Sequence, residues 1–209
     1  MAQTDVPDVV IGRLPIYLQT LKQLQASGQE FTSSKQLGQK LGIGSAQIRK
    51  DLAHFGEFGK QGMGYEVNYL QQQIAQILHA DRDWSVALVG IGDLGQAISH
   101  YSGFAHKGFH IEVIFDNDPQ KIGQNYNGKV IQDFNSIYQI LPTQNIKIAI
   151  MAVPSTSAQE VAEKLIVAGI RAILNYAPIS LTLPSYVKVQ SMDPLSHLQQ
   201  MSYYLDPLT

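Results

Sequence analysis

The sequence contains no cysteine, which excludes disulfides, cysteine-ligated metal sites and any switch that depends on a thiol. It also lacks an excess of charge of either sign, because 15 Lys and Arg oppose 17 Asp and Glu. Any binding to nucleic acid must therefore come from a local basic patch rather than from the charge of the whole molecule.

Long apolar runs are missing as well. No run reaches the roughly 18 residues that a membrane span needs, and the N-terminal residues do not have the pattern of a signal peptide. We therefore expect a cytoplasmic protein with no membrane partner. Of the 209 residues, 44% are hydrophobic, which is enough to form a sizeable core in one or two domains.

The most informative stretch covers residues 84–118. An apolar run at residues 86–89 leads into a G-x-G-x-x-G motif, a helical pattern follows, and a second apolar run ends at Asp116. This motif is typical of dinucleotide binding when it lies between a strand and a helix, with an acidic residue about 20 positions further on. The motif residues are Gly90, Ile91, Gly92, Asp93, Leu94 and Gly95.

Each part of this stretch has an expected role. Gly90 allows the tight turn, Gly92 lets the backbone approach a pyrophosphate, and Gly95 lets the helix pack closely on the strand. The start of the helix offers N–H groups to the phosphates. Asp116 would accept hydrogen bonds from a ribose 2′-OH and repel a 2′-phosphate, so we predict NADH or NAD⁺ as the ligand. A glycine-rich turn in a ligand-free domain is the alternative.

Apolar and helical patterns alternate through the rest of this region, which predicts an α/β fold with a Rossmann-type, doubly wound parallel sheet over residues 84–190. The predicted strands are residues 129–131, 146–153, 170–174 and 186–190, and the helices are residues 134–141 and 158–168. Ligands bind beyond the carboxyl ends of such strands. The residues expected there, around the nicotinamide, are Val153, Pro154, Asn175, Tyr176, Ala177 and Pro178.

The N-terminal third follows a helix-turn-helix pattern after a loose end at residues 1–8. Helices are predicted at residues 9–25, 35–41 and 46–55, with Pro15 either starting or kinking the first, and Ser45 capping the third. Ile48 and Leu52 would face the core. The outward residues Gln47, Arg49 and Lys50 lie early in the third helix, where side chains reach base edges.

A wing is predicted to follow the third helix. Four glycines in residues 56–64 and alternating apolar residues at 66–70 are typical of a β-hairpin, with Lys60 placed to contact phosphate. A helix at residues 71–80 then completes the first domain. Residues 1–80 contain seven basic and six acidic residues, so a protein-interaction module is the alternative. The order of caps, turn, basic helix and wing favours DNA.

The last predicted element is an amphipathic helix over residues 194–205, which packs either on its own domain or on a second subunit.

The other patterns in the sequence are weaker indications of function. The G-x-x-x-x-G-K at residues 123–129 lacks the Ser or Thr of a phosphate-binding P-loop. The histidines lack the spacing of a metal site, and no catalytic arrangement stands out. Because no catalytic arrangement is found, a small NAD-dependent oxidoreductase with a helical oligomerisation domain is kept only as the second hypothesis.

The chain resembles the Rex redox-sensing transcriptional repressors over nearly its whole length. The resemblance rests on residues 45–52, 55–65, 89–95, 115–119 and 173–178, and the joining of the Gln-Ile-Arg-Lys-Asp-Leu helix to the glycine wing is specific. It implies a homodimeric repressor, not an enzyme. Such proteins bind palindromic operator DNA when NADH is scarce and are released by NADH, with NAD⁺ competing for the same site.

The resemblance also implies three functional regions along the chain. Residues 1–80 would form a winged-helix DNA-binding domain, residues 84–190 an NAD(H)-binding domain, and residues 191–209 a helix swapped onto the partner subunit. Tyr101 matches an aromatic residue near the nicotinamide. Wings of the family often carry arginine where this chain has Gln61. The DNA-binding residues are expected to be Ser45, Gln47, Arg49, Lys50, Lys60 and Gly62.

Overall fold

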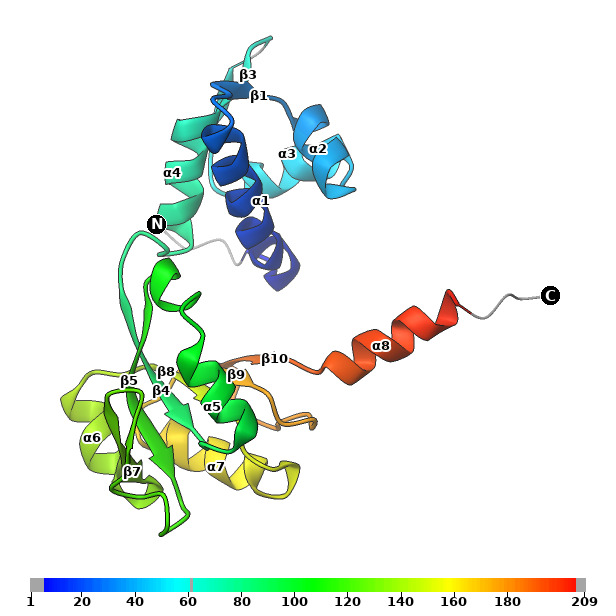
Figure 1. Cartoon of the computed structure of the whole chain (residues 1–209). Coiled ribbons are helices and arrows are strands. Elements are labelled where there is room, and N and C mark those ends of the chain that lie inside the picture. Colours follow the sequence, from blue (N-terminus) through cyan, green and yellow to red (C-terminus); the bar gives the residue numbers. More distant parts are fainter. Residues whose placement is uncertain (1–5, 61, 206–209) are drawn as a thin grey trace. The chain divides into compact units, whose positions relative to one another are not determined.

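The computed structural model describes residues 6–60 and 62–205. The chain forms two compact units, and the division lies between Arg82 and Asp83 (Figure 1). Gln61 and the first five residues of the predicted loose N-terminus lie outside the described residues. Within the described ranges, no helix combines the length and the apolarity that a membrane crossing requires.

Four helices build the first unit: α1 (Asp8–Ala26), α2 (Ser34–Leu41), α3 (Ser45–Ala53) and α4 (Val67–Ile77). Leucines on one stripe of α1 pack against Leu37 of α2, Ile48 of α3 and Ile74 of α4 in a single apolar core. The spacing of these residues at three and four positions explains why each helix has one buried face. The predicted helix-turn-helix is therefore present, with α3 as its second helix.

A small antiparallel sheet completes this unit. Strands β1 (Phe31–Thr32), β3 (Gly64–Glu66) and β2 (Gly59–Lys60) lie in the order β1-β3-β2. The predicted hairpin wing is formed by β2 and β3, but it ends earlier than expected. Val67 and Leu70 begin α4 instead of continuing the strand, because together with Ile74 they bury one helical face.

Two further predictions concern the helix starts of this unit. Pro15 does not start the first helix, because it lies inside α1, which begins at Asp8; of the two alternatives for Pro15, only a position within the helix remains. Pro15 is exposed, and because it has no backbone N–H, α1 lacks one helical hydrogen bond at this point. The predicted cap of α3 was wrong. Ser45 is the first residue of α3, and the residue that precedes the helix as its cap is Gly44, which supplies no side chain.

The second unit is built on a seven-stranded sheet. Its order is β10-β9-β8-β4-β5-β7-β6, and every pair is parallel except β6 with β7, which forms an antiparallel edge hairpin. The strands are β4 (Trp84–Val89), β5 (Phe109–Asp116), β6 (Asn125–Tyr126), β7 (Lys129–Asp133), β8 (Ile148–Met151), β9 (Ala172–Asn175) and β10 (Lys188–Ser191).

Helices cover both faces of this sheet (Figure 1). Val86 and Leu88 of β4 pack on the side of α5 (Asp93–His100), whereas Ala87 and Val89 pack on the side of α6 (Ile137–Thr143) and α7 (Ser155–Val167). A strand buried on both faces reads as a continuous apolar run, which is why the sequence pattern identified it. The doubly wound α/β class is thereby confirmed.

Some boundaries in this unit differ from the prediction. A 3₁₀ turn at Phe134–Ser136 precedes α6, and α6 continues past the expected end to include Pro142, which is exposed. Helix α7 begins at Ser155 after Pro154, three residues earlier than expected, with no side-chain cap from Thr156 or Ser157.

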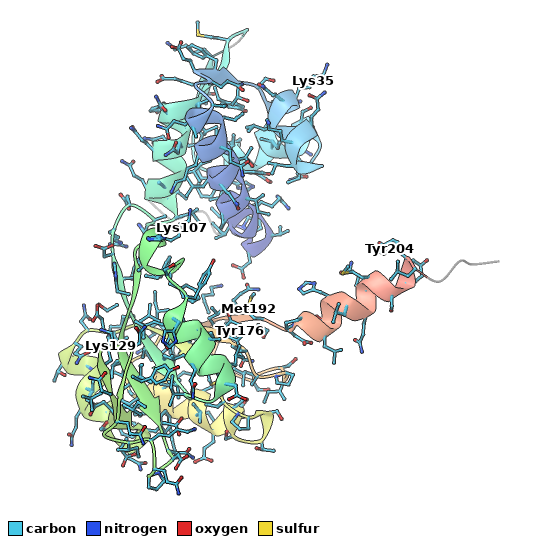
Figure 2. All side chains as sticks on the ribbon, in the orientation of Figure 1. Lys35, Lys107, Lys129, Tyr176, Met192 and Tyr204 are labelled. Atoms are coloured by element: carbon cyan, nitrogen blue, oxygen red, sulfur yellow. The ribbon has the colours of Figure 1, made fainter. Side chains whose placement is uncertain are left out.

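The last helix among the described residues is α8 (Pro194–Tyr203), whose N-cap Asp193 accepts a hydrogen bond from the backbone N–H of Leu195. No residue of α8 is buried. Leu195, Leu198 and Met201 are 59–60% exposed, and Tyr204 follows at the exposed end of the helix (Figure 2). Their spacing of three residues places these apolar side chains on one face of the helix.

Candidate functional site: a dinucleotide cleft and a DNA-facing helix

The glycine-rich turn between β4 and α5 has the geometry that its sequence predicted. Gly90 has a φ of +90°, and a Cβ there would meet the carbonyl oxygen of Ala152 at 2.5 Å. A Cβ on Gly95 would collide with the carbonyl oxygen of Gly90. Gly92 differs, because a Cβ there would meet no protein atom within 4 Å. Two glycines are therefore needed by the protein itself, and the third leaves open space.

A cleft of about 720 Å³ lies beside this turn. Of the predicted cofactor residues, the cleft is lined by Gly90, Gly92, Asp93, Leu94, Asp116, Val153 and Pro154. Tyr176, Lys121 and Asp118 also line it; Tyr176 lies directly after β9 (Figure 2). The structure thus brings the motif, the acid after β5 and the end of β8 to one hollow.

Asp116 is 7% exposed and is held firmly in place. One carboxylate oxygen accepts a hydrogen bond from the N–H of Ile91 at 2.8 Å, and the other accepts from the N–H of Asp118 at 2.9 Å. The carboxylate therefore ties the glycine-rich turn to the end of β5. Each oxygen has a second lone pair for a further donor.

Lys121 is a residue that the sequence reasoning missed. Its ammonium nitrogen lies 3.6 Å from Asp116 and 3.8 Å from Asp118, beside the cleft. The signal was present, because Lys121 follows Asp118 by three residues in a turn. A cation here partly neutralises the two carboxylates, so Asp116 alone does not set the charge of this end of the cleft.

The remaining predicted cofactor residues do not line this cleft. Asn175 is fully buried, and its side chain bonds to the backbone of Ala177 and to the carbonyl of Ile179, so it shapes the loop after β9. Ile91 is in the core. Tyr101 is 63% exposed and lines a different hollow of about 400 Å³, with its ring edge-on to Phe104.

In the first unit, the predicted DNA residues lie on α3 and the wing. Arg49, Lys60 and Gly62 line one hollow of about 510 Å³, together with Glu57 and Ser34. Arg49 donates a hydrogen bond to the hydroxyl of Ser34 at 3.1 Å, which links α3 to α2. Gln47 and Lys50 are exposed elsewhere on α3, and Ser45 is half-buried at its start.

A buried polar cluster, which the sequence reasoning also missed, underlies α3. Asp51 of α3 is 0% exposed, and it accepts two hydrogen bonds at 2.6 Å from the guanidinium of Arg13 on α1. Tyr17 of α1 and Gln47 of α3 donate to the same carboxylate at 2.6 and 2.8 Å. Burial alone would raise the pKa of Asp51, but these donors hold it below its ordinary value.

Two other groups of residues considered in the sequence analysis can also be placed in the structure. Residues 123–129, the motif that resembles a P-loop, form part of the β6–β7 hairpin, with Asn127 and Gly128 at positive φ. Over residues 6–60 and 62–205, no three His, Asp or Glu side chains gather in a way that would hold a metal ion.

Comparison with known proteins extends these observations over the whole chain. Two family models match: a putative DNA-binding protein N-terminus over residues 5–53, and a CoA binding domain over residues 81–179. The redox-sensing transcriptional repressor Rex of Chloroflexus aurantiacus is 52% identical, over 98% of this chain and 97% of that protein. The Rex of Desulfitobacterium hafniense is 42% identical over 97% of each.

Solved structures of RSP, a Rex-family repressor, are also similar to the chain. RSP in complex with β-NAD⁺ and operator DNA matches with a TM-score of 0.91 and 36% identity, over 97% of this chain and 94% of that one. RSP in complex with β-NADH matches with a TM-score of 0.87 and 34% identity, over 97% and 95%. The chain belongs to the Rex family of redox-sensing transcriptional repressors.

Proposed function

We propose that this protein is a transcriptional repressor that binds palindromic operator DNA as a homodimer and is released from it by NADH. The strongest support is that one chain contains both a DNA-binding type of fold and a dinucleotide-binding type of cleft. One unit has a helix-turn-helix with a wing, and the other has the glycine-rich cleft. RSP, which is similar over 97% of this chain, binds β-NAD⁺, β-NADH and operator DNA.

The cleft supports a preference for the reduced nucleotide. Oxidised nicotinamide carries a positive charge and the reduced ring is neutral. At the end of β8 the cleft is lined by Ala152, Val153 and Pro154, with Tyr176 beside them, and burial in apolar surroundings disfavours a charge. A ligand shifts a conformational equilibrium only by the difference in its affinity for the two states. The apolar lining at this end of the cleft favours binding of the neutral NADH over the charged NAD⁺, so the two nucleotides need not shift the equilibrium equally.

Dimerisation is assigned to α8. The helix buries none of its own residues, and its apolar face is exposed, as expected for a helix that packs on a second subunit. A dimer reads two half-sites about 34–36 Å apart, so a ligand that changes the distance between its two α3 helices weakens binding. A cytoplasmic location stays a prediction that follows from access to DNA.

The test is a mobility-shift assay on a palindromic duplex, titrated with NADH and separately with NAD⁺. We expect NADH to release the complex and NAD⁺ alone to leave it intact. Binding that responds to neither nucleotide would overturn the redox-sensing part of the proposal. No binding at any salt concentration, with turnover of a carbonyl or hydroxyl substrate, would favour the oxidoreductase hypothesis, which the repressor names of the relatives already disfavour.

Arg49→Ala is expected to weaken operator binding and to leave NADH binding unchanged. Arg49 is exposed on α3 beside the wing, and a lost arginine contact to DNA costs about 1–3 kcal/mol. Fluorescence anisotropy at several salt concentrations measures the affinity and the salt slope, and calorimetry measures NADH binding. Lys22→Ala, which removes the same charge from an exposed position on α1, is the control. Equal affinities for Arg49→Ala and wild type would refute the assignment.

A further inference from the structure

The buried cluster beneath α3 determines how Gln47 is presented. Asp51 receives four hydrogen bonds, from two nitrogens of Arg13, from the hydroxyl of Tyr17 and from the amide nitrogen of Gln47. Arg13 and Tyr17 come from α1, and Gln47 lies one turn before Asp51 on α3. Three of the four bonds are therefore made by a different helix, so α1 fixes the position of the carboxylate.

The identity of the Gln47 amide group that faces Asp51 follows from charge. An ionised carboxylate only accepts hydrogen bonds, so it must face the NH₂ group and not the carbonyl oxygen of Gln47. The guanidinium of Arg13 at 2.6 Å keeps that carboxylate ionised. The two ends of a glutamine side chain are hard to tell apart by shape alone, but here the chemistry of Asp51 leaves one orientation.

The oxygen of Gln47 is consequently turned away from the cluster. Gln47 is exposed, and among the described residues nothing donates a hydrogen bond to its side-chain oxygen. It is the third residue of α3, in the first turn, and the first turn of a recognition helix is the part that reaches base edges. An acceptor and one remaining N–H thus face outward from a fixed side chain.

We propose that Gln47, held by Asp51, is a specificity-determining residue that selects a base with an amino group in the major groove, with adenine preferred to cytosine. Only adenine and cytosine present such a donor there, whereas guanine and thymine offer acceptors to an incoming acceptor. Adenine also accepts at N7, so it satisfies both the oxygen and the remaining N–H of Gln47. This inference rests on the proposed DNA-binding function.

The test compares wild type with Gln47→Met, which keeps the length of the side chain and leaves Asp51 with its three bonds from α1. Each protein is titrated against duplexes in which every position of one half-site carries each of the four base pairs in turn. Wild type is expected to prefer adenine at one position by roughly 5- to 150-fold over guanine or thymine. Gln47→Met is expected to lose that preference and keep the others. Gln39→Met, the same change on an exposed position of α2, is the control.

A base analogue isolates the contact. Placing 2-aminopurine at that position removes the amino group from the major groove and keeps the pairing with thymine. It should weaken wild-type binding by a similar factor and leave Gln47→Met unaffected. Asp51→Asn provides the test of positioning, because an asparagine offers either a donor or an acceptor to Gln47. It should broaden the preference at this position alone.

The outcomes separate the two proposals. Wild-type protein that binds no duplex overturns the proposed function and this inference together. Wild-type binding with a base profile that Gln47→Met leaves unchanged overturns the inference alone. A Gln47-dependent preference for guanine or thymine overturns it as well, because that preference would mean that the NH₂ group faces the DNA.

Discussion

Gly92→Val is expected to abolish the response to NADH while leaving the protein folded. A Cβ on Gly92 would meet no protein atom within 4 Å, and its φ of −73° and ψ of −170° are open to valine. The residue lines the cleft and precedes α5, whose N–H groups are placed for the phosphates. Valine would fill the space that a pyrophosphate needs. Loss of two charge-assisted hydrogen bonds, at about 1.5–3 kcal/mol each, weakens binding on the order of a hundredfold or more.

The measurements are calorimetry with NADH, a mobility shift with and without NADH, and thermal melting. Gly92→Val should bind operator DNA as wild type does, remain bound at NADH concentrations that release wild type, and melt close to wild type, with only about 1 kcal/mol lost at the helix cap. Undiminished NADH affinity would show that the pyrophosphate does not lie against this turn.

Gly95→Ala is the matched control for this experiment. It is the smaller substitution, yet its Cβ collides with the carbonyl oxygen of Gly90, which is backbone and cannot swing aside. It should therefore lower the melting temperature of the ligand-free protein as well as weaken NADH binding. Comparing the two variants distinguishes a glycine that the ligand requires from a glycine that the fold requires. The motif alone does not make this distinction, because it contains both.

The sequence predicted those features that depend on neighbouring residues. The glycine motif was identifiable because its strand, turn and helix are consecutive. The sheet was identifiable because strands buried on both faces are continuous apolar runs. Helix ends were less predictable. Pro15 and Pro142 lie inside α1 and α6, and both are exposed, although a proline within a helical pattern usually marks a helix end or a kink.

The buried cluster beneath α3 escaped prediction because it depends on residues far apart in the chain, unlike Lys121, which lies close to Asp116 in the sequence. Arg13 and Asp51 are 38 positions apart and become partners only when α1 packs on α3. A single sequence shows both as ordinary charged residues. Asn175 is the converse case. Its position at the end of a strand predicted a ligand contact, and in the structure its side chain bonds to its own loop. Polar residues near strand ends serve either purpose, and only the folded chain distinguishes them.

Asp51→Ala is expected to be the most damaging single change in the first unit. It leaves the guanidinium of Arg13 and the hydroxyl of Tyr17 without the carboxylate that both contact. Removing one partner of a fully buried ion pair costs about 3–5 kcal/mol. Because the side chain of Arg13 is 21% exposed, we expect a cost towards or below the lower end of this range, to be compared with the roughly 5–15 kcal/mol that stabilises a typical domain. The first unit should unfold at a lower denaturant concentration and operator binding should fall, while NADH binding to the second unit persists. Loss of NADH binding as well would show that the second unit does not keep its cleft when the first unit unfolds.

The same carboxylate predicts a dependence on pH. The folded-state pKa of Asp51 is lowered, so its contribution to stability is present above the pKa of an unfolded aspartate, about 3.9, and is lost as the pH falls through the folded-state pKa. The difference in unfolding free energy between wild type and Asp51→Ala should therefore shrink in acid. A difference that grows as the pH falls would show that Asp51 is not the ionised partner of Arg13.

Replacing the whole cluster distinguishes the loss of an interaction from the exposure of unpaired groups. Arg13→Met, Tyr17→Phe and Asp51→Leu together leave no buried charge, and apolar replacement of a buried ion pair is often neutral for stability. The combined variant should thus be more stable than Asp51→Ala alone, although it carries more substitutions, because effects within one network do not add. It would still lack the acceptor that holds Gln47. We therefore expect the combined variant to regain stability but not the preference for adenine. This result would show that the cluster contributes to base recognition as well as to stability.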